Sequence, residues 1–504
     1  MHIFSTLFDA KSVDNELRTE EGCREAANWC RESGVTKVYI ESFRKVFIER
    51  EHLEKLRDFF EGEGFGVDGC VTPVGFPKPS TTYNEVGCMS HIPNHELLEE
   101  IFRRTASVFD TIMIDDFLFT NCDCEECKRN AGGRSLNQYN NDAMFEVCLE
   151  RILKPAKEVN PKCKIIIKYP CWYDIFYSGW HYGGYDVVRQ TEVFDKIWAG
   201  TETRDPDNEY WGRSPQTQAA YMMQWDIKLG GEKCGGGWFD HFGTKPATYL
   251  EQARNTILGG ARESMLFCYK QLHESKDGIT DISVLRTELK DLHKLAYLIE
   301  NKKPVGVSVP KKPNADAETE RYIAGMYSMI GIPVTADIDL DENARAVILG
   351  SQSVKYPNVR TYAKEMLEKG KTVAFTEGFL AYTNYNAPDG SVIFKPGNDI
   401  WNLTKIPQTE MDSMRNALLA PFGLELYAPS RVALNLFDDD MEIIQNFNDF
   451  PADIKLKING RDRKTRKIAL KLSADKNDKT DITINRSGGE YNITVPPRTL
   501  IVLN

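Results

Sequence analysis

The feature that most constrains the fold of this chain is a regular alternation of short apolar runs and amphipathic helical patterns through residues 1–300. The helical patterns repeat apolar residues at i, i+3 or i+4, and i+7, most clearly in 20–33, 51–62, 95–109 and 140–159. Eight successive strand–helix units are typical of a (β/α)₈ barrel. The expected strands are 2–10, 37–43, 65–74, 111–117, 163–169, 196–202, 235–242 and 264–269.

The competing α/β architecture is a doubly wound open sheet. Such a sheet seldom needs eight units, and its nucleotide-binding form has a glycine-rich first turn that this sequence lacks. We therefore predict a TIM barrel over residues 1–301, ending with the helical pattern 281–300.

A chain of 504 residues is too long for one core, and the pattern changes after the barrel. Residues 302–437 begin with the plausible linker KKP and continue as a smaller α/β unit of flavodoxin-like pattern. From 438 to 504 apolar residues alternate with Lys and Thr at a period of two, which is typical of half-exposed antiparallel strands. We expect this last unit to be a small β-sandwich.

Charge and hydropathy exclude some partners. A formal net charge of −11 disfavours nucleic acid and anionic membranes, which both require a basic surface. No apolar run reaches the ~18 residues of a spanning helix. The first residues, MHIFSTLFDA, lack the pattern of a signal peptide, so we expect a cytoplasmic location, or a periplasmic one if a signal has been removed.

In a barrel of this kind, the active site lies at the C-terminal ends of the strands. Several acidic residues and large aromatic residues are expected there. Aromatic faces stack on sugar rings and paired carboxylates cleave glycosidic bonds, so these residue types predict a carbohydrate site. The candidates are Glu41, Asp115, Asp116, Lys168, Tyr169, Trp172, Glu202, Arg204, Trp238, Asp240, His241 and Tyr269.

The carboxylates in this set have structural as well as catalytic interpretations. In a regular strand Asp115 and Asp116 cannot both point into the barrel mouth, so we expect Asp116 to be catalytic and Asp115 to make a structural hydrogen bond or contact substrate. Glu202 is either catalytic or paired with Arg204. The remaining alternatives are that Glu41 pairs with Arg44, and that His241, beside Asp240, caps a helix or satisfies a buried polar group.

Three cysteines, Cys122, Cys124 and Cys127, follow the fourth strand in a Cys-x-Cys-x-x-Cys run. This spacing predicts a metal site, and a closed tetrahedral zinc site needs a fourth ligand. Cys88 and Cys70 are the candidates, and Cys88 is favoured because its loop neighbours the cysteine run in a barrel. Such a zinc would be structural; the alternative is a set of reduced surface thiols.

The architecture together with the run IDDFLFTNCDCEECKR (114–129) resembles the family-42 β-galactosidases. The resemblance implies a catalytic barrel, an α/β domain that mediates trimerisation, a small C-terminal β domain and a zinc site in which Cys88 is the early ligand. It also implies a homo-oligomer, a trimer or a dimer. The family has Asn-Glu at the end of strand 4 and Glu at strand 7, whereas this chain has Asp116-Phe117 and Asp240.

Carboxylates on strands 4 and 6 instead resemble the α-galactosidase clan, which implies Asp116 as nucleophile and Glu202 as acid/base, with Asp240 as a further candidate. We therefore expect a glycoside hydrolase acting on an oligosaccharide or glycoside. One alternative is a non-catalytic carbohydrate-binding barrel. Another is a metal-dependent hydrolase, which would need ligands in the mouth, where only His241 and His273 lie near strand ends.

Overall fold

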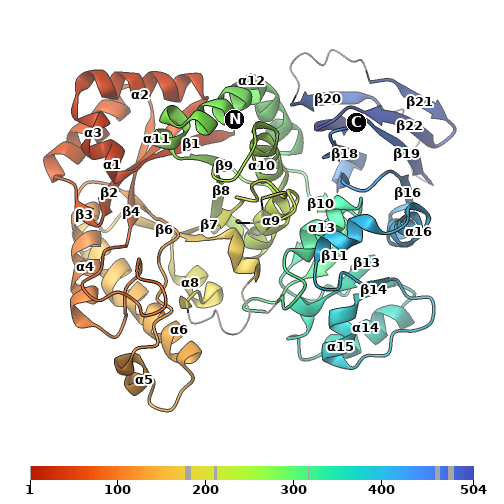
Figure 1. The fold of residues 1–504 in the computed structure, drawn as a ribbon, viewed down its shortest axis with the longest axis horizontal. Coiled ribbons are helices and arrows are strands. Elements are labelled where there is room, and N and C mark those ends of the chain that lie inside the picture. Colours follow the sequence, from red (N-terminus) through yellow and green to blue (C-terminus); the bar gives the residue numbers. More distant parts are fainter. Residues whose placement is uncertain are drawn as a thin grey trace.

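The structure is a computed structural model that describes residues 2–175, 183–208, 210, 213–315, 317–459, 466–474 and 482–504. Figure 1 shows the barrel on one side of the molecule and the two later units on the other, with α12 (Lys276–Ile299) leading from the first to the second. In the part of the chain that is described, no helix is long and apolar enough to cross a membrane.

Eight parallel strands close into a barrel, which confirms the predicted fold. The sheet order is β1-β9-β8-β7-β6-β5-β4-β2, and β1 pairs with both β2 and β9, so the sheet closes on itself (Figure 1). A short strand, β3 (Val46–Phe47), folds back antiparallel on β2. The barrel strands are β1 (Ile3–Phe8), β2 (Val35–Arg44), β4 (Gly66–Thr72), β5 (Thr111–Ile114), β6 (Lys164–Tyr169), β7 (Lys196–Gly200), β8 (Cys234–Asp240) and β9 (Glu263–Phe267).

Alternate residues of these strands face the barrel interior and the surrounding helices. Leu7, Met113 and Trp198 pack together inside the barrel, whereas Ile112 and Ile114 pack in the outer layer. The helices around the barrel are α1 (Ala10–Asp14), α2 (Glu20–Glu32), α3 (Arg50–Gly62), α4 (Ile92–Ala106), α5 (Glu125–Ala131), α6 (Leu136–Val147), α7 (Lys154–Val159), α8 (Val187–Val193), α9 (Gln218–Gly230), α10 (Pro246–Leu258), α11 (Tyr269–Glu274) and α12.

Most element boundaries differ by a few residues from the expected ones, and two of these differences bear on the site and its surroundings. Strand β5 ends at Ile114, so the Asp pair lies just beyond it and strand alternation no longer decides where both side chains point. The expected helix 140–159 begins earlier, at Leu136, where Ser135 accepts a hydrogen bond from the Gln138 amide at 3.2 Å. It runs through a π-helical segment, Cys148–Leu153, into α7.

The second unit is built on a parallel sheet, as expected from its pattern. Its strand order is β12-β11-β13-β14-β15, and its helices include α13 (Ile323–Met329), α14 (Val359–Glu368) and α15 (Glu377–Thr383). The strands are β11 (Val307–Pro310), β12 (Val334–Asp337), β13 (Ala346–Leu349), β14 (Thr372–Thr376) and β15 (Ile393–Phe394).

Two antiparallel sheets form the C-terminal part, in the orders β10-β17-β18-β23-β20 and β16-β19-β22-β21. They include β16 (Leu424–Tyr427) and β17 (Val432–Phe437), which precede residue 438, and β10 (Pro304–Val305). We propose that the C-terminal unit begins near 424, after α16 (Gln408–Leu419). The other strands are β18 (Met441–Asn446), β19 (Ala452–Ile458), β20 (Ile468–Ser473), β21 (Ile484–Ser487), β22 (Glu490–Val495) and β23 (Thr499–Leu503).

Close backbone packing at the end of β7 gives a first prediction. A Cβ added to Gly200 would lie 2.2 Å from the Cys171 backbone nitrogen and 2.8 Å from Glu202 Oε2. Gly200→Ala should therefore lower the free energy of unfolding by about 1–3 kcal/mol, measured by urea denaturation. The control is Gly62→Ala at the end of α3, where nothing lies within 4 Å of the new Cβ. Equal stability of both variants would contradict the close approach.

Candidate active site

A network of buried ionic groups closes the C-terminal end of the barrel interior. Lys168 Nζ donates to Asp115 Oδ1 at 2.8 Å, and Arg44 Nη2 donates to Asp115 Oδ2 at 3.0 Å. Arg44 Nε also lies 3.0 Å and 3.1 Å from the two carboxylate oxygens of Glu41. The Thr72 hydroxyl donates to both carboxylates. Glu41 thus pairs with Arg44, one of the two alternatives that the sequence leaves open.

The two carboxyl groups of this network differ in their electrostatics. Burial alone would raise the pKa of Asp115, but Lys168 and Arg44 outweigh it and lower this pKa to about 2. Burial dominates at Glu41 and raises its pKa, against the opposing effects of Arg44 and Thr72. Asp115 is therefore a fixed anion that holds two cations in place, and its oxygens are already engaged.

Asp116 lies beside this network and is partly exposed. Burial, together with the neighbouring charges of Asp115 and Asp240, raises its pKa to about 6, while Lys168 and Arg204 oppose the shift. Its carbonyl oxygen accepts a hydrogen bond from the Tyr185 hydroxyl at 3.1 Å. In the described part of the chain no hydrogen bond reaches its carboxylate, which leaves the carboxylate available to a ligand.

Glu202 and Asp240 lie at the ends of the next strands around the barrel. Burial raises the pKa of Glu202 to about 7; Arg204 opposes the shift, and Asp240 and Asp116 add to it. Glu202 Oε2 is buried without a hydrogen-bond partner among the described residues. Arg204 pairs with Asp240, with Nη2–Oδ2 at 2.9 Å and Nε–Oδ1 at 3.2 Å. The Arg204–Asp240 ion pair therefore acts electrostatically on both Asp116 and Glu202.

Aromatic side chains surround these carboxylates. The Trp238 ring lies 4.0 Å from Lys168 Nζ, inside the barrel. Phe119 contacts Trp172 and Tyr185, with ring centroids 5.8 Å and 6.0 Å apart. His241 is buried, and in the described structure neither of its ring nitrogens has a hydrogen-bond partner. Apolar ring faces beside unpaired polar atoms suit a ligand that carries both C–H and hydroxyl groups.

Two of the expected substrate-binding residues lie away from the barrel mouth. Tyr169 is buried, and its hydroxyl lies 3.1 Å from Thr191 of α8. Tyr269 packs edge-on against Phe8 and Trp29 in the helix layer. Both tyrosines point outward from the strand ends, so we leave them out of the candidate site.

Three residues at the barrel mouth were not predicted from the sequence to contact substrate: Arg44, Tyr83 and Tyr185. The sequence predicted Arg44 only as an ion-pair partner of Glu41. Its position at the end of the same strand, three residues after Glu41, could have indicated that it lies at the barrel mouth. Tyr83 stacks on Phe119 with ring centroids 5.7 Å apart and an interplanar angle of 15°. Tyr83 and Tyr185 come from long loops, and no local pattern in these loops predicts which way a side chain points.

The four cysteines expected to bind a metal come together. Their Sγ atoms lie within 4.8 Å of one another, and Cys88 Sγ is 3.7 Å from Cys124 and 3.6 Å from Cys127. Ser90 Oγ lies 3.1 Å from Cys127 Sγ and 2.6 Å from the Tyr139 hydroxyl. Cys70, the other candidate for the fourth ligand, packs inside the barrel. The cluster of four cysteines could hold a metal ion.

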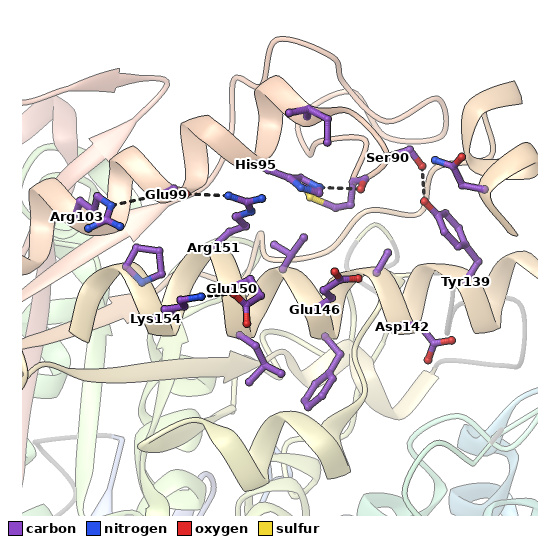
Figure 2. A pocket seen from close by; sticks show the side chains of 18 of the residues that line it. Ser90, His95, Glu99, Arg103, Tyr139, Asp142, Glu146, Glu150, Arg151 and Lys154 are labelled. Atoms are coloured by element: carbon purple, nitrogen blue, oxygen red, sulfur yellow. Dashed lines mark hydrogen bonds and ion pairs between the residues drawn. The ribbon is translucent and has the colours of Figure 1, made fainter. Parts of the chain in front are cut away.

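A separate groove of about 990 Å³ runs along the outer flank, between α4 and the helix formed by α6 and α7. Figure 2 shows that its charged side chains pair along the walls: Glu99 Oε1 accepts from Arg103 at 3.0 Å and Glu99 Oε2 from Arg151 at 2.9 Å. Lys154 pairs with Glu150 in the same way at 2.8 Å. These arginines lower the pKa of Glu99, so this carboxyl group is a paired anion and is not poised for proton transfer.

Comparison with known proteins is consistent with the barrel site. Residues 1–288 match a family model described as "Probable glycosyl hydrolase, catalytic domain". An uncharacterised protein of Saccharolobus solfataricus is 24% identical over 391 residues, which cover 71% of this chain and 63% of that protein. This chain therefore spans less than two thirds of the length of that relative.

One solved structure is similar to this chain in fold, and a second was compared with it. An exo-β-1,4-mannosidase, Op5Man5 from Opitutaceae bacterium strain TAV5, superposes with a TM-score of 0.50 at 10% identity, covering 98% of this chain and 91% of that one. The PgaB (BpsB) glycoside hydrolase domain from Bordetella bronchiseptica gives a TM-score of 0.42 at 11% identity, covering 57% of this chain and 98% of that one.

The raised pKa of Glu202 predicts a pH-dependent stability. Because burial raises this pKa from 4.5 to about 7, the folded state binds the proton more tightly than the unfolded state does. The associated stability is present below pH 4.5 and is lost as the pH rises to about 7. Between pH 4 and 8, the unfolding free energy of the wild type should fall relative to that of Glu202→Gln by roughly 3 kcal/mol.

Urea denaturation at several pH values measures this difference. The control is Glu21→Gln on the exposed face of α2, whose profile should follow that of the wild type. Parallel profiles for the wild type and Glu202→Gln would mean that Glu202 titrates as an ordinary exposed carboxyl group.

Proposed function

The chain belongs to the family described as probable glycosyl hydrolase, catalytic domain, and on that premise we propose that it hydrolyses a glycosidic bond in an oligosaccharide or glycoside. One observation carries the proposal: two carboxyl groups with raised pKa values, Asp116 and Glu202, share the barrel mouth with the Arg204–Asp240 ion pair. A carboxyl group that keeps its proton near neutral pH can act as a general acid.

In the proposed mechanism Glu202 protonates the glycosidic oxygen as the bond to the anomeric carbon breaks. Asp116, ionised above a pKa of about 6, attacks that carbon, and Glu202 then deprotonates the water that releases the sugar. If the two carboxyl groups bind a water molecule between them, Asp116 activates that water instead and the configuration inverts. Asp240, paired with Arg204, would contact the sugar hydroxyls or serve as the alternative carboxylate.

Substitution of the two carboxylates tests these roles. Asp116→Asn and Glu202→Gln should each lower kcat by about a thousandfold and change KM little, because both groups act on the bond rather than on binding. The measurement is turnover of a panel of α- and β-nitrophenyl glycosides, with NMR of the first-formed product anomer. The control is Asp142→Asn in the flank groove.

Near-full activity in both variants would contradict the assignment. Sugar binding without turnover of any glycoside would instead support the alternative, a non-catalytic carbohydrate-binding barrel. That alternative is favoured by one observation: Asp116-Phe117 stands where the family-42 β-galactosidases have Asn-Glu.

We propose that the metal held by the four cysteines is zinc and that it is structural. Four sulfurs at about 2.3 Å from a tetrahedral zinc lie about 3.8 Å apart, close to the 3.6–3.7 Å between Cys88, Cys124 and Cys127. Four thiolate ligands leave no open position for water. Bound zinc would link the loop before α4 to the loop after β5.

Elemental analysis tests the zinc site. Purified protein should contain one zinc per chain, and Cys127→Ser should lose it and melt at a lower temperature, because the two loops are no longer tied together. Cys163→Ser, a buried thiol outside the cluster, is the control and should keep the metal. Full zinc content in Cys127→Ser would exclude this ligand set.

Two further proposals concern the assembly and the location of the protein. From the resemblance to the family-42 enzymes we propose a trimer or a dimer, which sedimentation equilibrium would test. None of the twelve cysteines, all of which lie in the described residues, forms a disulfide, which supports the proposal of a reducing compartment such as the cytoplasm.

A further inference from the structure

A second cavity, of about 460 Å³, lies at the C-terminal rim of the barrel above β1, β2, β4 and β5. Its walls include Arg44, Val74, Tyr83, Glu85 and Phe117. A volume of this size is within the range of small-molecule sites and exceeds what an ordered water molecule needs.

The cavity adjoins the proposed catalytic carboxylate. Phe117 follows Asp116 in the chain, and Arg44 binds Asp115 at 3.0 Å on the other side of the same turn. Tyr83 stacks on Phe119, which follows Asp116 by three residues in the loop after β5. A molecule bound in the cavity would therefore lie against the turn that carries Asp116.

The walls of the cavity match the surface of a sugar ring. Tyr83 has 41% of its surface exposed and is backed by Phe119 in a nearly parallel stack, so one ring face stays open. The cavity also has polar groups that could bind sugar hydroxyls. Lys45 pairs with Glu85 at 2.9 Å, and the Arg44 side chain is 31% exposed. A pyranose carries C–H groups on one face and hydroxyl groups around its edge. The C–H face would stack on Tyr83, and the hydroxyl groups would contact the polar side chains.

The charges of the cavity favour a neutral sugar. Among the lining residues Lys45 pairs with Glu85 at 2.9 Å, Asp14 pairs with Arg18 outside the cavity, and Lys11 is exposed to solvent. The guanidinium of Arg44 is already bound by two carboxylates, those of Glu41 and Asp115. Because carboxylates already engage Arg44 and Lys45, these two lining cations give little advantage to a sugar acid or a phosphorylated sugar.

The loop that carries Tyr83 is anchored on both sides. The Ser80 amide donates to the Val86 carbonyl at 2.8 Å, and Thr81 Oγ1 donates to Asp123 at 2.6 Å. Cys88, at the end of the loop, belongs to the cysteine cluster. An aromatic side chain held in this way loses little conformational entropy on binding.

We propose that this cavity is a second sugar subsite, in which a neutral sugar stacks on Tyr83 while the neighbouring sugar lies against Asp116. The substrate is then a disaccharide or longer oligosaccharide rather than a monosaccharide glycoside. This inference rests on the proposed function, because it assigns the site a second sugar beside the one that is cleaved.

The test compares kinetics on matched nitrophenyl glycosides of one and two sugars. The wild type should prefer the disaccharide in kcat/KM. Tyr83→Ala should reduce the ratio of the two kcat/KM values by about tenfold, mainly through KM, because it removes one stacked ring. Tyr83→Phe keeps the ring face and should retain most of the preference. Tyr297→Ala, an equally drastic change at an exposed position on α12, is the control and should leave the ratio unchanged.

An unchanged ratio in Tyr83→Ala, or no preference for disaccharides in the wild type, would overturn the subsite. Calorimetric titration with cellobiose, mannobiose and maltose separates this failure from failure of the proposed function. If Tyr83→Ala binds the disaccharides about tenfold more weakly and no glycoside is turned over, the subsite is supported and hydrolysis is contradicted. If glycosides are turned over and Tyr83→Ala does not change disaccharide binding, hydrolysis is supported and the subsite is contradicted. The absence of both turnover and disaccharide binding overturns both.

Discussion

The two ends of the barrel interior are closed by buried ionic groups, and the rest of the site depends on this arrangement. At the N-terminal end Lys37 pairs with Asp68 and Glu263, at 2.8 Å and 3.1 Å. At the other end Asp115 binds Arg44 and Lys168. Between them lies an apolar layer that excludes water. Buried charges of this kind are tolerated only when each has its partner, so the strand ends must keep their register.

The buried ionic groups at the C-terminal end of the barrel also explain why neighbouring carboxyl groups have different pKa values. Asp115 lies where two cations reach it, and its pKa falls to about 2. Asp116 is one residue further on, beyond the end of β5, and burial raises its pKa to about 6. Glu202 is buried without a direct cationic partner among the described residues, because Arg204 is engaged by Asp240, and its pKa rises to about 7. One closed barrel therefore contains both a permanent anion and two groups suited to proton transfer.

The cysteine cluster lies outside this electrostatic system, between two loops that reach the barrel mouth. The loops that meet at the cluster come from either side of α4 and also carry Tyr83 and Phe119 toward the mouth. The loop before α4 has backbone hydrogen bonds of its own, such as Ser80–Val86 and Cys88–Lys78, and a metal at the cluster would tie it in addition to the loop after β5. The loops that contain the cysteines therefore also contain aromatic residues that line the site.

The sequence alone determined the barrel, because hydrophobic periodicity and strand–helix alternation are local patterns that survive without any long-range information. It also placed Asp116, Glu202 and Asp240 at strand ends, where barrel topology brings residues together. Only the tertiary structure decided which carboxylate is paired: the sequence could not tell that Arg204 binds Asp240 rather than Glu202. Nor could it show that Tyr169 and Tyr269 point into the helix layers, or that β16 and β17 join the C-terminal sheets. Each of these outcomes depends on pairing between distant segments, and such pairing leaves no periodic signal in the chain.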